Sequence, residues 1–237
     1  MDKSALVAVM LKIASELEDI GGAVIPASIR TLTALYAVKF NRSQGIADIQ
    51  GEYAAKLESS ILGYLTGQTT WTRGRNEFRR TVYSGIAYAF EAGWAAGGAD
   101  PDNLTAEAIA RIGAMTDEEV GFTGDLWAQL KEILAAGLPD NAEDIAQDHA
   151  ANYARTLQGI YNEAIMMADR SRIAIWRLGQ TEDHCETCAG LDGNEHTLGW
   201  FLDNGYIPQQ RGSTTLECGG WRCDCRIEDK DGNQIMP

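Results

Sequence analysis

All five cysteines of this 237-residue chain lie in its last quarter, and their spacing limits how that part can fold. Cys185 and Cys188 form a C-x-x-C pair, and Cys218, Cys223 and Cys225 follow as a second cluster. Two short-spaced groups of cysteines separated by a loop are typical of tetrahedral zinc sites, because each short spacing lets two sulfurs approach one ion. An odd number of cysteines also fits a metal site or reduced thiols better than a closed set of disulfides.

The sequence leaves the choice of ligands open. Cys218 is an alternate ligand, and His184 and His196 are held in reserve. A site of four thiolates has no open coordination position, so we expect a structural zinc ion that stabilises the fold and does not activate water. The alternative is that these cysteines are ordinary buried or free thiols. Our first-choice ligands are the following four: Cys185, Cys188, Cys223 and Cys225.

The charge of the chain favours protein partners over nucleic acid. Thirty-four acidic side chains against twenty basic ones give a formal charge of −14. Such a surface repels DNA and anionic membranes, so any contact with DNA would be local. The apolar segment 5–13 is interrupted by Lys12 and followed by acidic residues, and the chain lacks the apolar run of about 18 residues that a membrane span needs. We therefore expect neither a transmembrane helix nor a secretory signal.

Two local groups of arginines stand out against this acidic background. They could contact phosphates or an acidic partner, but we favour solvated helix positions paired with nearby carboxylates. The first group lies near Trp71 and the second precedes the cysteines. Their members are Arg73, Arg75, Arg79 and Arg80, then Arg170, Arg172 and Arg177.

Helical periodicity dominates the chain up to about residue 170. Apolar residues recur there at spacings of three and four. Thr116 and Glu119 have the spacing of a capping box and predict the start of one of the helices. Pro139 and Asp140 separate that helix from a longer one. We expect helices that include these ranges: 4–17, 29–40, 46–61, 78–94, 120–134 and 145–164.

After Asp169 the sequence favours short extended pieces. The segment 172–178 is β-branched and aromatic enough for a strand, although continuation of the preceding helix is nearly as well supported. Glycines then divide the remainder into turns, and a bound ion would compensate for its thin core. The fold class we predict is α+β, with a helical region over 1–140 and a small zinc-stabilised module over 141–237. The main core candidates after Arg177 are Trp200, Phe201, Tyr206, Ile207, Trp221 and Ile227.

Three enzymatic interpretations compete for the same cysteines. A redox C-x-x-C usually follows a strand in a βαβ unit, whereas the chain before Cys185 is mainly helical. The triplet 184–186 matches the H-x-E of zinc deaminases, but their C-x-x-C lies well downstream and here it overlaps. A His-Asn-His nuclease needs more histidines around its metal than this chain offers. The only histidines are His149, His184 and His196.

Several short motifs follow one another in the last third of the chain. In order, they are Tyr161-Asn162-Glu163-Ala164, Arg172 with Trp176, Asp183 before the C-x-x-C pair, Leu191-Asp192-Gly193, and Cys223-Asp224-Cys225-Arg226-Ile227. In this order they resemble the C-terminal region of phage minor head proteins of the Mu F type, also called the SPP1 head morphogenesis family. The resemblance covers residues 153–228 and implies a variable helical region before them.

The chain departs from that family at the end of the motif series. Cys218-Gly219-Gly220 stands where the family commonly has a His-Pro approach, and Asp224 replaces the arginine of a Cys-Arg-Cys ending. Cys218 therefore either takes the place of a histidine ligand or is the spare fifth thiol.

The resemblance implies a virion structural protein that is not an enzyme. Its partners would be the portal and other phage head proteins, with possible local contact to packaged DNA and none to a membrane. It would be present in several copies in the phage head, and in the host cytoplasm during assembly. Two other hypotheses stay open. A zinc-dependent, nuclease-like enzyme acting on nucleic acid predicts metal-dependent DNA cleavage or deamination, and an adaptor outside any virus predicts stable capture of a cellular partner.

Overall fold

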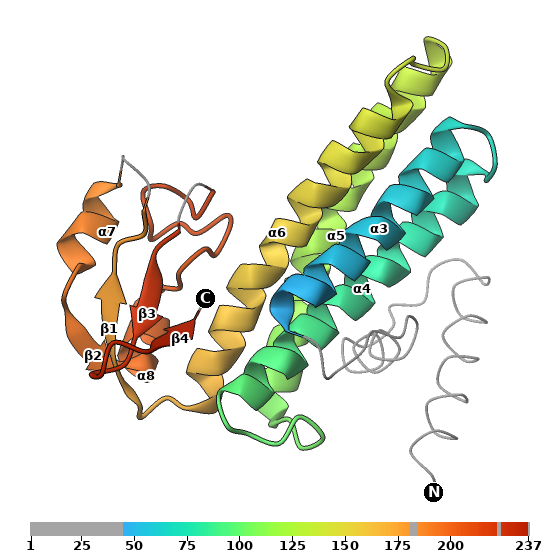
Figure 1. Cartoon of the computed structure of the whole chain (residues 1–237). Coiled ribbons are helices and arrows are strands. Elements are labelled where there is room, and N and C mark those ends of the chain that lie inside the picture. The colour runs from blue at the N-terminus through green and yellow to red at the C-terminus, as the bar shows by residue number, and fades with distance from the viewer. Residues whose placement is uncertain (1–44, 181–183, 222–223, 237) are drawn as a thin grey trace, which may run out of the picture. The chain divides into compact units, whose positions relative to one another are not determined.

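The structure is a computed structural model that describes residues 45–180, 184–221 and 224–236 (Figure 1). The helices predicted over 4–17 and 29–40 lie outside these residues. The described helices are α3 (Ile46–Leu65), α4 (Trp71–Ala96), α5 (Ala106–Ala135), α6 (Ala142–Ala168), α7 (Glu186–Leu191) and α8 (Leu198–Asp203). The strands are β1 (Ile173–Arg177), β2 (Glu195–Thr197), β3 (Arg226–Glu228) and β4 (Gln234–Met236).

The described chain divides into two compact units. Residues 45–88 and 104–154 form the first, and residues 89–103 and 155–236 form the second. Helices α4 and α6 contribute residues to both units. The division therefore differs from the boundary between 140 and 141 that the sequence suggested, because no break in periodicity marks the point at which a continuous helix passes from one core to another.

The first unit is a helical bundle in which the predicted apolar faces are buried. Figure 1 shows α3, α4, α5 and α6 running side by side. The ring of Phe78 on α4 packs edge-on against Tyr153 on α6 at 5.1 Å and against Trp127 on α5 at 6.0 Å between centroids. Gly74 lets α4 approach α5, since a Cβ there would lie 2.8 Å from the Trp127 ring. Within the described residues, no helix is long and apolar enough to cross a membrane.

The predicted start of α5 was wrong. The helix begins at Ala106, where the hydroxyl of Thr105 caps it by accepting a hydrogen bond from the amide of Ala108 at 3.2 Å. Thr116 is buried in the middle of the helix, and its hydroxyl donates to the carbonyl of Ile112 at 2.7 Å. A threonine can satisfy its hydroxyl within a helix in this way, so the capping spacing alone did not mark the helix start.

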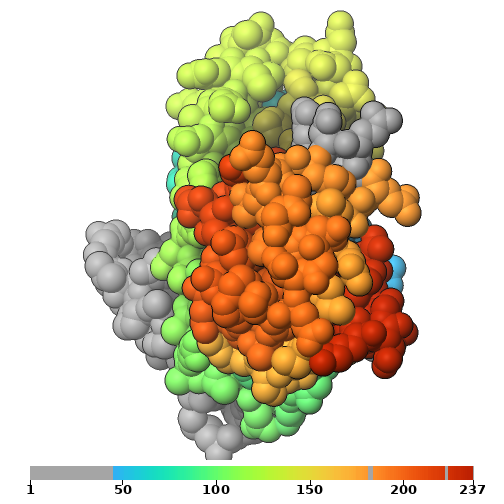
Figure 2. Space-filling model, turned by 90° about the vertical axis from the view of Figure 1, so that its left-hand side faces the viewer, coloured from blue at the N-terminus to red at the C-terminus, as the bar shows by residue number. Residues whose placement is uncertain are grey.

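The second unit contains a four-stranded sheet in the order β2-β1-β3-β4, with every neighbouring pair antiparallel. The strand predicted around 172–178 is therefore confirmed as β1, and so is the α+β fold class. In β1, Ala174 and Trp176 are buried in the core, while the alternate residues are partly exposed. In Figure 2 the orange and red atoms of this unit form one continuous surface.

Most of the predicted core of the second unit is buried. Phe201, Ile207 and Ile227 are buried, and Trp200 and Tyr206 pack partly buried against them. Trp221 was predicted wrongly, because its side chain is 59% exposed. The indole lies over the turn at Gly219, and the Arg211 guanidinium stacks on it at 4.8 Å.

Candidate metal centre

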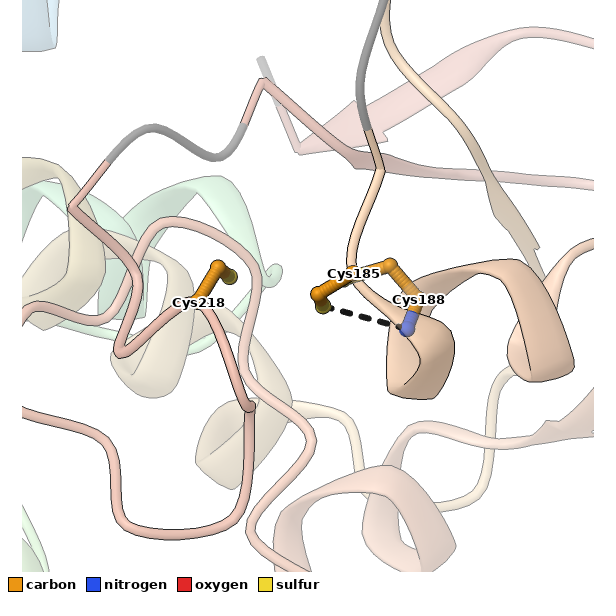
Figure 3. A group of neighbouring side chains, drawn as sticks. All are labelled: Cys185, Cys188 and Cys218. Carbon is orange, nitrogen blue, oxygen red and sulfur yellow. Dashed lines mark hydrogen bonds between the residues drawn. The ribbon is translucent and has the colours of Figure 1, made fainter.

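Three of the five cysteines bring their sulfurs together. The Sγ atoms of Cys185, Cys188 and Cys218 all lie within 4.8 Å of one another. Figure 3 shows the first two at the start of α7 and Cys218 on a loop that faces them. With zinc–sulfur bonds of about 2.3 Å, a tetrahedral site separates its sulfurs by about 3.8 Å. Shifts of about an ångström would therefore let one ion contact all three, so these thiols can hold a metal ion.

The start of α7 positions the first two sulfurs. Cys185 is the N-cap of this helix, and its sulfur accepts a hydrogen bond from the backbone amide of Cys188 at 3.4 Å (Figure 3). The C-x-x-C spacing makes this contact local, because the amide three residues after an N-cap points back toward its side chain. Cys188 is buried, whereas Cys185 is half-buried. The pair is thus fixed by short-range geometry.

Hydrogen bonds favour the thiolate form of Cys185. Burial alone would raise the pKa of this thiol. Hydrogen bonds from the backbone amide and the thiol of Cys188, and from the backbone amide and the thiol of Cys218, lower it. The net shift of the Cys185 pKa is downward. The thiolate is the form of cysteine that binds metal. The backbone amides can keep these hydrogen bonds when the sulfur binds an ion, whereas the thiols of Cys188 and Cys218 would give up their protons to become ligands.

A long loop after α8 supplies the third sulfur. Within it, the amide of Gly219 donates to the carbonyl of Leu216 at 2.7 Å, and the amide of Trp221 donates to that of Cys218 at 3.2 Å. The Leu216 side chain is buried in the core of the second unit. The carboxylate of Glu217 accepts a hydrogen bond from the amide of Thr187 on α7 at 3.4 Å. The loop is thus tied to α7 immediately beside Cys218.

The other predicted ligands lie elsewhere or cannot be placed. Cys225 is 1% exposed and belongs to the hydrophobic core, just before β3. Cys223 lies outside the described residues. His196 stacks on the Trp200 ring at 3.6 Å between centroids. Among the described residues, neither Cys225 nor His184 nor His196 joins the three-sulfur group.

The sequence carries a spacing signal for Cys218, the alternate ligand. Four residues separate Cys218 from Cys223, and gaps of two to four residues between ligands are usual in zinc sites. Cys223 and Cys225, the first-choice pair, are separated by a single residue. What the spacing could not show is which of these sulfurs the fold turns toward α7.

Four of the seven arginines singled out in the sequence lie beside carboxylates, as we expected. Arg73 lies 2.9 Å from Glu77 on the exposed side of α4. The three arginines that precede the cysteines also have acidic partners in the second unit. Their pairs are Arg170 with Asp203, Arg172 with Asp229, and Arg177 with Glu228. Of the others, Arg75 lies over the Trp71 ring at 5.0 Å, and Arg79 donates to the hydroxyl of Tyr83 at 3.4 Å.

Comparison of the chain with family models, curated proteins and solved structures finds no significant match. The functional argument therefore rests on the fold, on the cysteine group and on the order of motifs in the last third of the sequence.

Proposed function

We propose that the protein is a phage minor head protein, a structural component of the virion whose second unit is stabilised by a zinc ion. Cys185, Cys188 and Cys218 would hold this ion, and Cys223 stays the predicted fourth ligand. The observation that carries the proposal is the convergence of three sulfurs from two segments that are distant in the sequence. Scattered thiols would have no reason to meet in this way.

The small size of the surrounding sheet supports a structural role for the metal. Strands β2, β3 and β4 have three residues each, so they contribute few hydrogen bonds and little apolar surface. Structural zinc sites compensate for thin cores, with apparent binding free energies of about 10 kcal/mol or more. Four thiolates would leave no position for a reactive water, which favours a structural protein over a zinc-dependent enzyme.

Three of the motifs that carry the resemblance to Mu F-type proteins lie in the described part of the second unit and contribute to its core or turns, which supports a shared module. Asn162 is fully buried on α6, and Trp176 is fully buried on β1. In the Leu191-Asp192-Gly193 motif, Leu191 is buried, the Asp192 carboxylate accepts from the amide of Leu178 at 3.2 Å, and Gly193 has a φ of 77°. These three motifs thus contribute to the core and the turns of the unit that contains the cysteines.

The proposed partners are proteins of the phage head, in particular the portal. The chain carries a formal charge of −14, so it suits protein contacts better than broad DNA binding. We propose that several copies are built into the head, after assembly in the host cytoplasm.

Mass spectrometry of purified particles from a strain that produces the protein tests this proposal. We expect the full chain in mature heads at a few copies per particle, and we expect it to remain with portal-containing fragments when heads are disrupted. Its absence from particles would overturn the proposal. Metal-dependent cleavage or deamination of DNA by the purified chain, lost in Cys188→Ala, would instead favour the enzyme.

A further inference from the structure

We infer that Gly159, Asn162 and Glu163 of α6 are positioning residues of the metal centre, which hold the loop 204–221 so that Cys218 reaches the two cysteines of α7. Asn162 and Glu163 belong to a motif singled out in the sequence to which no role had been given. The inference deepens the proposed function and rests on it, since it concerns the geometry of the same zinc site.

Two buried polar side chains fasten the loop to α6. Asn162 is fully buried, and its Nδ2 donates to the carbonyl of Pro208 at 2.9 Å. Glu163 is 4% exposed, and its carboxylate accepts a hydrogen bond from Nε2 of Gln210 at 3.0 Å. A buried polar group that loses its hydrogen-bond partner destabilises the fold, and a charged one does so more strongly. These bonds therefore select one position for the segment 208–210.

Gly159 allows this segment to lie directly on the helix. A Cβ at this position would lie 2.7 Å from the Cα of Gln210 and 3.1 Å from the carbonyl oxygen of Gln209. Gln209 itself has a φ of 59°, a left-handed conformation that is uncommon for residues other than glycine. The close approach thus depends on a glycine in α6 and on an unusual turn in the loop that meets it.

Direct contacts lead from the anchored segment to Cys218. The carbonyl of Gln210 fills the space that a side chain at Gly220 would need. The amide of Gly212 donates to the carbonyl of Gly219 at 2.9 Å, and the amide of Trp221 donates to that of Cys218 at 3.2 Å. The backbone on the C-terminal side of Cys218 is therefore stacked on the part of the loop that α6 holds.

The position of Cys218 decides whether the site is complete. Cys185 and Cys188 both lie at the start of α7, whereas Cys218 comes from the loop. A displaced loop would withdraw one of the three sulfurs and leave the other two in place. Residues that only orient metal ligands typically change metal affinity by about 10- to 100-fold when they are altered.

Gly159→Ala in the full chain tests the inference, with Gly124→Ala as the matched control. Both changes replace a helical glycine by a better helix former, but a Cβ at Gly124 meets no atom within 4 Å. Zinc affinity is measured by competition with a chromogenic chelator. We expect Gly159→Ala to bind zinc about 10- to 100-fold more weakly than wild type, and Gly124→Ala to bind it as wild type does. Gln210→Ala, which removes the bond to Glu163 without adding bulk, should weaken binding in the same direction.

Two outcomes separate the failure of this inference from that of the proposed function. If both Gly159→Ala and Gln210→Ala bind zinc with wild-type affinity, the positioning role of the α6 residues is contradicted, while the zinc site itself stands. A wild-type chain that binds no zinc would overturn the proposed function. In that case, the rate at which Cys218 is alkylated in the metal-free protein tests the positioning role of the α6 residues. A faster rate in Gly159→Ala than in Gly124→Ala supports this role, and equal rates contradict it.

Discussion

Glu228 on β3 shows how single residues join the strands of the second unit. Its side chain is 13% exposed, and its carboxylate accepts hydrogen bonds from Arg226 at 2.8 Å and from Arg177 on β1 at 3.2 Å. The bond from Arg226 is the main cause that lowers the pKa of Glu228; partial burial opposes it, and Arg177 adds to the lowering. The ionised form is therefore the one that stabilises the fold.

We expect Glu228→Gln to lower the free energy of unfolding at pH 7 by about 1 kcal/mol. Because the pKa of Glu228 is lower in the folded state, its contribution is present above the ordinary glutamate pKa of about 4.3 and is lost as the pH falls through the folded value. Urea unfolding at pH 7 and near pH 3, both with chelator so that zinc release adds nothing, measures this difference.

Glu195→Gln is the control for that experiment. Glu195 pairs with Lys230 at 2.9 Å, but its side chain is 49% exposed. We expect a smaller effect at both pH values. A Glu228→Gln variant that is equally destabilised at pH 7 and pH 3 would contradict the role given to the charge.

At the cysteine group, the sequence sufficed for the two candidate ligands whose geometry is local. Cys185 and Cys188 are brought together by a helix start that their own spacing encodes. Cys218 could only be given as an alternate, because its position depends on contacts between the loop 204–221 and α6. Such contacts between distant segments leave no periodic or spacing signal along the chain.

At the scale of the elements, α4 and α6 pack closely against each other in the second unit, and small residues make this possible. A side chain at Gly93 would meet the carbonyl of Tyr161 and the Cβ of Ala164, and a Cβ at Gly97 would lie 2.6 Å from that of Ala168. Glycine weakens a helix, so its presence at both positions fits a need for close packing.

We expect Gly93→Ala to lower the free energy of unfolding by about 1–3 kcal/mol, because the added methyl group forces the two helices apart. Gly121→Ala in α5 is the matched control, since a Cβ there meets nothing within 4 Å and should raise stability by about 0.5–1 kcal/mol. Chemical unfolding of the three chains measures both values. Equal changes of the same sign would show that packing at Gly93 is not tight.

The helices were easier to predict from the sequence than the strands. Long apolar stripes marked α3, α4 and α6, because each covers several turns of one face. Helix α5 was found with the wrong start, since Thr105 caps it and Thr116 does not. Strands β2, β3 and β4 have three residues each, and their partners in the sheet, not their own pattern, make them strands.

For the whole molecule, the account predicts that metal removal affects one unit and spares the other. The cysteine group ties α7 to the loop 204–221 within the second unit, while the bundle of the first unit has its own core. We expect chelation to increase amide hydrogen exchange in α7 and in this loop, and to leave exchange in α3 and α5 unchanged. Hydrogen-exchange mass spectrometry with and without zinc measures this. Equal increases in both units would contradict a local structural role for the metal.

The most direct test of the central claim is the zinc content of three chains by native mass spectrometry: wild type, Cys218→Ala and Cys225→Ala. Cys218 lies in the three-sulfur group, whereas Cys225 is a buried cysteine of the same core that lies outside the group, so the two variants compare a sulfur inside the group with one outside it. We predict one zinc ion per chain in wild type and in Cys225→Ala, and its loss or marked weakening in Cys218→Ala. A wild-type chain without zinc and with five reactive thiols, or loss of zinc from Cys225→Ala but not from Cys218→Ala, would contradict the account.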